Sequence, residues 1–311
     1  MNAPKGGSAS TPESRKKLPV NPSLEHLQKQ AKRLVKNSPK LKLAGAQHQL
    51  AQEYGFKNWP ELIHVVNAMA RRHDSAATNP QGHGLIPKAA RAADILGIRE
   101  ILAGGDFTQH DLNQGLAHAV WYQEHGTWED RKQIADLLIE HGADPDGQYG
   151  SGGYGPIVFG TGECLHPAGL QYLIDAGADV TFAPVETKYG VQCPMSTWLG
   201  TYARGNNERK HAGINILLAH GAYVPPELHP AILAIHCGDT ETLAKLIDAD
   251  PSLPRRHFDD MLYGNMKLNG ATLLHCAVEF GEIACIDLLL DRWMEPNVQA
   301  HVINGIGGQT P

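Results

Sequence analysis

The sequence predicts an all-α protein built as a solenoid of helix pairs behind a small helical module. Three observations support this fold class. An apolar helical run that ends in Gly-Ala-Asp or a close variant recurs along the chain, long polar loops separate the copies, and the first 73 residues differ sharply in charge from the rest. Self-similarity at a roughly fixed period is the sequence signature of stacked repeats.

The N-terminal part of the chain is basic and the remainder is acidic. Residues 1–73 hold 13 Lys and Arg against 4 Asp and Glu, a net charge of +9. The remaining residues hold 14 against 29, a net of −15, and the two sum to the formal −6 of the whole chain. Residues 1–20 are rich in Gly, Ser and Lys and contain no apolar signal core, so we expect a disordered tail there.

Residues 21–72 are predicted to form a basic module of three helices. Asn21-Pro22 begins the first helix, and Asn37-Ser38-Pro39 ends it. Gly55 closes the second helix, while Asn58 and Glu61 form the capping pair of the third. Apolar residues at helical spacing mark the three segments. One face of the first helix has Leu24, Leu27, Ala31, Leu34 and Val35, the second helix carries Leu43, Ala46, Leu50, Ala51 and Tyr54, and the third buries Leu62, Val65, Val66 and Met69. The aromatic residues Tyr54, Phe56 and Trp59 are expected in the core of the module.

Basic side chains cluster on and just after the first predicted helix: Lys29, Lys32, Arg33, Lys36, Lys40 and Lys42. Such a cluster could contact phosphates. It could equally be a solvated face, or a surface that docks on the acidic repeats or on a partner. No reading helix and no aromatic-basic RNA motif accompanies the charge, so a nucleic-acid tether remains an alternative to the main interpretation.

A linker is expected at 73–84, followed by about six repeat units over 85–311, the last of them incomplete. The glycine that ends each copy of the repeated phrase falls at 105, 142, 177 and 221, in steps of 37, 35 and 44 residues. A glycine can adopt the left-handed conformation that ends a helix. The extra length predicts long loops at 145–155, 181–193 and 254–269, and insertions in a solenoid usually map to its binding side.

The most complete copy begins Gly270-Ala271-Thr272-Leu273-Leu274-His275-Cys276-Ala277. It resembles the ankyrin repeat, whose motif is Gly-x-Thr-Pro-Leu-His-x-Ala, although Leu273 stands where that family has Pro. The copies that begin at Pro156, Pro194 and Pro230 keep the Pro and lose the His. The segment 46–62 is similar to an N-terminal element of bacterial ankyrin proteins, from which no chemistry can be transferred.

The resemblance implies that a protein partner binds in the groove formed by the loops and the first helices. In the three long loops, large aromatic and basic residues are the types that anchor protein interfaces. The candidate partner-binding residues are Tyr149, Tyr154, Lys188, Tyr189, Arg255, Arg256, His257, Tyr263 and Met266.

Sequence patterns that mimic catalytic or cofactor sites have simpler interpretations. The Gly-x-Gly-x-x-Gly match at 150–155 lacks a preceding buried strand, and Asp175 lies at the end of a repeat helix. His118 and His125, like His229 and His236, are seven residues apart without further ligands at recognisable spacing. No serine-nucleophile motif occurs, and we expect no catalytic residue, cofactor or metal.

The sequence therefore predicts a non-catalytic protein–protein interaction adaptor or scaffold. The alternatives are a nucleic-acid tether through the basic module and a metal-dependent hydrolase that uses His and Cys residues. Five cysteines without a Cys-x-x-Cys pattern and the lack of an apolar stretch long enough for a bilayer favour a cytoplasmic protein with reduced thiols.

The C-terminal residues Gly308-Gln309-Thr310-Pro311 are the opening of a further unit without its helices. We therefore expect residues 283–290 to expose apolar surface, and the protein to be a monomer unless a partner covers this end. On that basis, deletion of residues 296–311 should leave the melting of the rest nearly unchanged.

Overall fold

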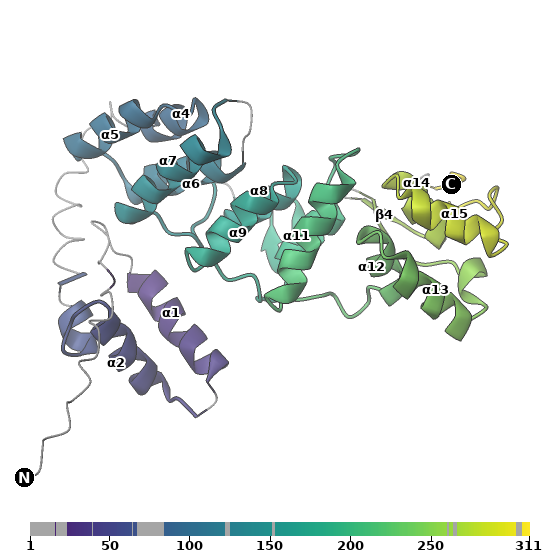
Figure 1. The fold of residues 1–311 in the computed structure, drawn as a ribbon, viewed down its shortest axis with the longest axis horizontal. Coiled ribbons are helices and arrows are strands. Elements are labelled where there is room, and N and C mark those ends of the chain that lie inside the picture. The colour runs from purple at the N-terminus through teal and green to yellow at the C-terminus, as the bar shows by residue number, and fades with distance from the viewer. Residues whose placement is uncertain are drawn as a thin grey trace, which may run out of the picture. The chain divides into compact units, whose positions relative to one another are not determined.

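The computed structural model describes residues 16, 24–38, 40–63, 65–66, 84–121, 125–150, 153–259, 261–263, 266–302 and 307–311 (Figure 1). The chain divides into two compact units, residues 1–78 with 140–142 (unit 1) and residues 79–139 with 143–311 (unit 2). Apart from Lys16 and Gly84, the expected tail at 1–20 and linker at 73–84 lie outside the described residues.

Unit 1 contains α1 (Leu24–Asn37) and α2 (Leu43–Glu53), followed by helical residues at 59–63 and 65–66. Asn58 Oδ1 accepts a hydrogen bond of 2.9 Å from the main-chain N–H of Glu61, which caps this third helix as its sequence indicated. The buried core consists of Leu27, Ala31, Ala46, Leu50, Ala51, Leu62 and Val66. Leu43 lies on the second helix as predicted, and this first residue of α2 is 43% exposed. Met69 lies outside the described residues.

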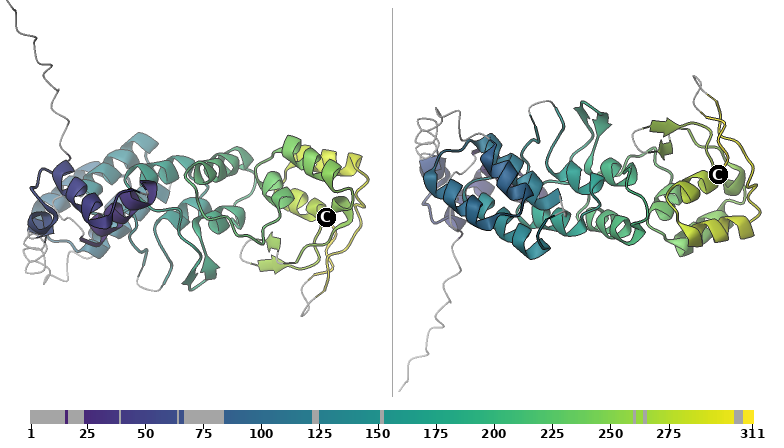
Figure 2. Two further views of the ribbon diagram at one scale, coloured as in Figure 1. Left: turned by 90° about the horizontal axis from the view of Figure 1, so that it is seen from below. Right: turned by 90° about the horizontal axis from the view of Figure 1, so that it is seen from above.

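The described part of unit 2 consists of helix pairs that follow one another along the chain (Figure 2). The pairs are α4 (Leu85–Arg91) with α5 (Ile95–Gly104), α6 (Gln109–Trp121) with α7 (Trp128–Glu140), α8 (Val158–Glu163) with α9 (Pro167–Asp175), α10 (Pro194–Leu199) with α11 (Asn207–Ala219), α12 (Pro230–His236) with α13 (Thr240–Ala249), and α14 (Leu273–Glu279) with α15 (Ile283–Asp291). A short 3₁₀ turn, η1 (Leu253–Arg255), follows α13. This is an all-α solenoid of the predicted kind.

The helix ends follow from the residues that the sequence places there. The glycines at 105, 142, 177 and 221 all have positive φ, between 68° and 105°, which a residue with a Cβ adopts only at a cost. At the start of α14, Thr272 and His275 form a capping box. The Thr272 main-chain N–H donates to His275 Nδ1 at 3.1 Å, so the proton of this ring lies on Nε2, 2.9 Å from the Gln309 carbonyl oxygen.

Among the described residues, the loops of unit 2 contain two short hairpins. Strand β1 (Val185–Thr187) pairs antiparallel with β2 (Gly190–Gln192), with Val185 opposite Gln192. Strand β3 (Met261–Tyr263) pairs antiparallel with β4 (Met266–Leu268), with Met261 opposite Leu268. In the loop at 145–155, Gln148 forms an isolated bridge to Pro156. We call the loops at 145–155, 181–193 and 254–269 finger 1, finger 2 and finger 3; they precede α8, α10 and α14.

The described residues of unit 2 form two separate hydrophobic cores. The first extends from Ile86 to Ala222 and the second from Ala231 to Ala300, and Leu228 packs against both. Consecutive pairs pack closely within each core, as α8 does on α10 and α12 on α14. Between α11 and α12 the stacking is interrupted, which the sequence did not indicate.

The C-terminal segment contacts the last helix pair. Ala300 is 3% exposed, its main-chain N–H donates to the Gln309 carbonyl at 2.9 Å, and Gly308 donates back to Ala300 at 3.0 Å. Ile283 and Leu290 are 65% and 43% exposed, in keeping with the expected apolar surface. The contacts of Ala300 and Gln309 argue against the expectation that residues 296–311 can be deleted without effect. No described helix is long and apolar enough to cross a membrane.

Candidate functional site

Aromatic rings form a continuous row from α6 through fingers 1 and 2. Trp121 contacts Tyr149 with 4.4 Å between ring centroids, Tyr149 contacts Tyr154 at 5.6 Å, and Tyr154 contacts Tyr189 at 5.9 Å. All three contacts are edge-on, the geometry that the ring quadrupole favours. We call these four residues the aromatic ladder. It begins on the buried Trp121 and ends on Tyr189, which is 53% exposed.

Lys188 contacts both aromatic rings at the outer end of the ladder. Its ammonium lies 3.1 Å from the centroid of the Tyr154 ring and 4.8 Å from that of Tyr189, and its main-chain N–H donates to the Gly153 carbonyl at 2.8 Å. The hydrogen bond with Tyr154 is the main cause that raises the pKa of Lys188. Cation–π contacts of this kind fix the ammonium over the rings. Fingers 1 and 2 thus form one surface of Tyr149, Tyr154, Lys188 and Tyr189.

The remaining candidate residues belong to finger 3. Arg255, Arg256 and His257 are exposed. The Arg256 guanidinium lies 5.1 Å from the centroid of Phe258, and His257 stacks on His301 with 5.0 Å between centroids. The side chains of Tyr263 and Met266 lie outside the described part of the chain, although their main chains form the end of β3 and the start of β4.

A cavity of about 510 Å³, which we call the seam pocket, lies where the two cores of unit 2 meet. Specific binding sites commonly have volumes of roughly 300–1,000 Å³. The walls come from finger 2, from α10, from α12 and the segment before it, and from finger 3. The lining residues are Pro184, Tyr189, Gly190, Val191, Gln192, Cys193, Ser196, Leu199, Pro225, Glu227, Leu228, Ile232, His236, Phe258, Asp259 and Met261. Among them, Tyr189 is the one residue that the sequence predicted to bind a partner.

His236 is the buried polar group of this pocket. Its side chain is 0% exposed, its Nε2 lies 3.7 Å from the Cys276 sulfur, and its ring centroid lies 4.5 Å from that of Phe280. Burial, aided by the Lys210 charge, holds the pKa of His236 well below 6.5, so the ring is neutral at pH 7. Its Nδ1 has no hydrogen-bond partner among the described residues.

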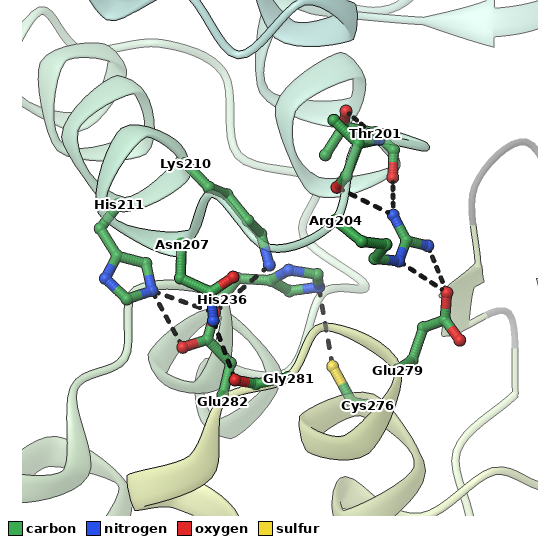
Figure 3. Close-up of polar contacts among 11 residues, drawn as sticks. Thr201, Arg204, Asn207, Lys210, His211, His236, Cys276, Glu279, Gly281 and Glu282 are labelled. Carbon is green, nitrogen blue, oxygen red and sulfur yellow. Dashed lines mark hydrogen bonds and ion pairs between the residues drawn. The ribbon is translucent and has the colours of Figure 1, made fainter.

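Behind His236, charged residues join α11 to the last helix pair, and Figure 3 shows this charged seam. His211 Nε2 lies 3.0 Å from Glu282 Oε1, and Lys210 Nζ lies 3.7 Å from the same oxygen. The Arg204 guanidinium donates to Glu279. Asn207 Nδ2 donates to the Gly281 carbonyl at 3.0 Å. These polar contacts lie where the apolar stacking between α11 and α12 is interrupted.

The two histidine pairs with a spacing of seven residues do not lie together on one helix. His229 caps α12, with its Nδ1 accepting from the Ala231 N–H at 3.2 Å, whereas His236 points into the interior at the other end of the helix. His118 lies on α6, and His125 follows the end of that helix. Burial raises the pKa of the Cys276 thiol to about 12, which keeps it protonated at neutral pH.

Comparison with known proteins identifies one of the repeat units. Residues 269–301 match the family model of the ankyrin repeat. Among solved structures, the ankyrin repeat domain of human ASB11 is similar, with 16% sequence identity, coverage of 72% of this chain and 89% of that chain, and a TM-score of 0.42. No curated protein sequence matches this chain. The matched residues span α14, α15 and the capping box of Thr272 and His275, and the preceding pairs repeat the same helix–turn–helix plan. Residues 269–301 therefore form an ankyrin repeat.

Proposed function

We propose that the protein is a non-catalytic adaptor or scaffold that binds a protein partner through fingers 1 and 2. Ankyrin repeats generally mediate protein–protein interaction, and ankyrin-repeat proteins are typically not enzymes. The observation that carries the proposal is the aromatic ladder: Lys188 and Tyr189 stand exposed at its outer end, on side chains that are already held in place. Rigid aromatic residues lose little conformational entropy on binding, and they dominate the energetics of interfaces.

The chemistry of the buried thiols supports an adaptor rather than a hydrolase. Burial raises the pKa of Cys237 and of Cys285 to about 11, and that of Cys276 to about 12. A thiol acts as a nucleophile or a metal ligand only after losing its proton. These three cysteines are therefore suited to packing.

A nucleic-acid tether through the basic module is the second candidate, and the structure of unit 1 favours it less. Lys29 forms an ion pair of 3.2 Å with Glu25, and Lys16 one of 2.9 Å with Glu53, so part of the positive charge is met within the module. The adaptor proposal keeps four further predictions from the sequence. These are the separate helical module at 21–72, the repeat domain at 85–311, the cytoplasmic location and the bacterial type of the chain.

A capture experiment with the full-length chain tests the adaptor. The baits are the unchanged protein, the double variant Lys188→Ala/Tyr189→Ala, and the control Tyr202→Ala/Lys245→Ala, which removes one exposed aromatic and one exposed ammonium elsewhere. Quantitative mass spectrometry should find proteins that the control retains and the finger variant loses, by roughly tenfold or more. Identical sets of captured proteins on all three baits would contradict the proposed surface.

A further inference from the structure

The seam pocket exists because the repeat stack is interrupted. Leu199 belongs to the first hydrophobic core, while Ile232 and Phe258 belong to the second, and all three line the cavity. In an uninterrupted stack such residues would bury one another. Here these side chains, which are at most 6% exposed, border a cavity in which an apolar group would gain further van der Waals contacts.

Apolar surface continues from the pocket onto finger 2. Val191 is 59% exposed and Tyr189 is 53% exposed, and both belong to the pocket lining. A small molecule that filled the cavity alone would leave these two side chains in water. A polypeptide segment can place one apolar side chain in the cavity and cover Tyr189 and Val191 with its neighbours, as anchor residues do in protein interfaces.

The negative charge around the pocket favours a partner segment with basic residues. Glu227 and Asp259 line it and are exposed, and neither forms an ion pair with another described residue. Residues 74–311 together carry a net charge of −15. A partner segment with Lys or Arg beside its apolar residue would complement both features, whereas acidic residues there would be repelled.

We propose that the seam pocket binds an apolar anchor side chain of a protein partner, in a segment where Lys or Arg flanks the anchor. Glu227 and Asp259 receive the basic flank, and Tyr189 and Val191 cover the residues next to the anchor. This assignment rests on the proposed adaptor function, and it adds the chemistry of the partner.

Selection from a random library of phage-displayed peptides on the immobilised full-length protein tests it. Selected peptides should be enriched in a large apolar residue next to Lys or Arg. Their affinity, measured by fluorescence anisotropy, should fall roughly tenfold or more on Glu227→Gln/Asp259→Asn and on Tyr189→Ser/Val191→Ser. Binding to Glu227→Gln/Asp259→Asn should also depend less on salt.

Two control variants match these changes. Glu100→Gln/Glu129→Gln removes two exposed carboxylates elsewhere, and Leu96→Ser/Tyr202→Ser removes two exposed apolar side chains elsewhere. Both should bind the selected peptides as the unchanged protein does.

Three outcomes would overturn the inference: no enriched peptide, enrichment in acidic flanks, or equal affinity for pocket and control variants. A partner that is lost from the Lys188→Ala/Tyr189→Ala bait but retained by Glu227→Gln/Asp259→Asn would refute this role of the pocket while leaving the adaptor function intact. Loss of finger dependence altogether would instead refute the adaptor surface.

Discussion

Lys210 is a buried ammonium with a distant counter-ion. Its side chain is 2% exposed, and its Nζ lies 3.7 Å from the centroid of Phe280 and 3.7 Å from Glu282 Oε1. Burial lowers the pKa of Lys210 from 10.5 to about 8. The unfolded chain therefore binds this proton more tightly than the folded protein between pH 8 and 10.5, so stability rises with pH across that window. Below pH 8 the charged form costs the fold about 3 kcal/mol.

Replacing Lys210 with Met should stabilise the protein at pH 7 by about 1–3 kcal/mol, because the buried charge is removed while Glu282 keeps His211 as its partner. Urea denaturation measures the change, and the gain should shrink at pH 10. The control Lys245→Met removes an exposed ammonium that is paired with Glu241, and should change stability by less than about 0.5 kcal/mol. A loss of stability in Lys210→Met would show that its attraction to Glu282 outweighs its burial.

Helix α11 packs closely on α10 because residue 213 of α11 is a glycine. A Cβ added at Gly213, in the middle of α11, would lie 2.0 Å from the ring of Trp198, which is fully buried on α10. Glycine lowers helix stability by roughly 1 kcal/mol relative to alanine, yet the tryptophan ring occupies the space that alanine needs. Close packing of the two helices, rather than helix propensity, therefore requires glycine at position 213.

The change Gly213→Ala should therefore destabilise the protein by about 1–3 kcal/mol despite the better helix former. Gly104→Ala is the matched control, since Gly104 ends α5 and an added Cβ meets nothing within 4 Å. That control should be neutral or stabilising by up to about 1 kcal/mol. Thermal melting distinguishes the two, and equal effects of both substitutions would contradict the fit of Trp198 against α11.

Local sequence signals predicted the helix pairs and their ends, but not how the pairs meet. The terminal glycines and the capping pairs at Asn58 and Thr272 act within one turn of chain, so they can be recognised without the fold. The charged seam brings Lys210 to Glu282, which are 72 residues apart in the sequence. Such a contact depends on tertiary packing, which a local pattern does not contain.

The candidate site was predictable to a similar extent. Residue type and loop position pointed to Tyr149, Tyr154, Lys188 and Tyr189, and the structure brings these four together. Their role in binding remains a prediction. The seam pocket could not be foreseen, because its walls come from segments between Pro184 and Met261 that meet only where stacking fails.

At the scale of the whole molecule, histidine burial makes the fold sensitive to acid. Burial lowers the pKa values of His166, His236 and His275, and lowers that of His118 to about 4. These rings are neutral in the folded protein, while the unfolded chain takes up protons below about pH 6.5. Their contribution to stability is complete above that pH and is lost as the pH falls through the window below it.

The melting temperature should consequently drop between pH 7.5 and pH 5, by about 2–4 °C for each kcal/mol lost. Calorimetry at a series of pH values measures this slope. The variant His118→Gln should show a shallower decline, because one of the lowered groups is gone. A melting temperature that stays level from pH 7.5 to pH 5 would contradict the burial of these rings.

The aromatic ladder gives the protein an optical probe of its own. Neighbouring ring centroids lie between 4.4 and 5.9 Å apart, so light absorbed by Tyr189, Tyr154 or Tyr149 can pass as excitation energy to Trp121, which emits at longer wavelength. Anything that moves Tyr189 away from Tyr154 and Trp121 lowers the share of its excitation energy that reaches the tryptophan. Events on the fingers can thus be followed in the unlabelled protein as a fall in tyrosine-sensitised tryptophan fluorescence.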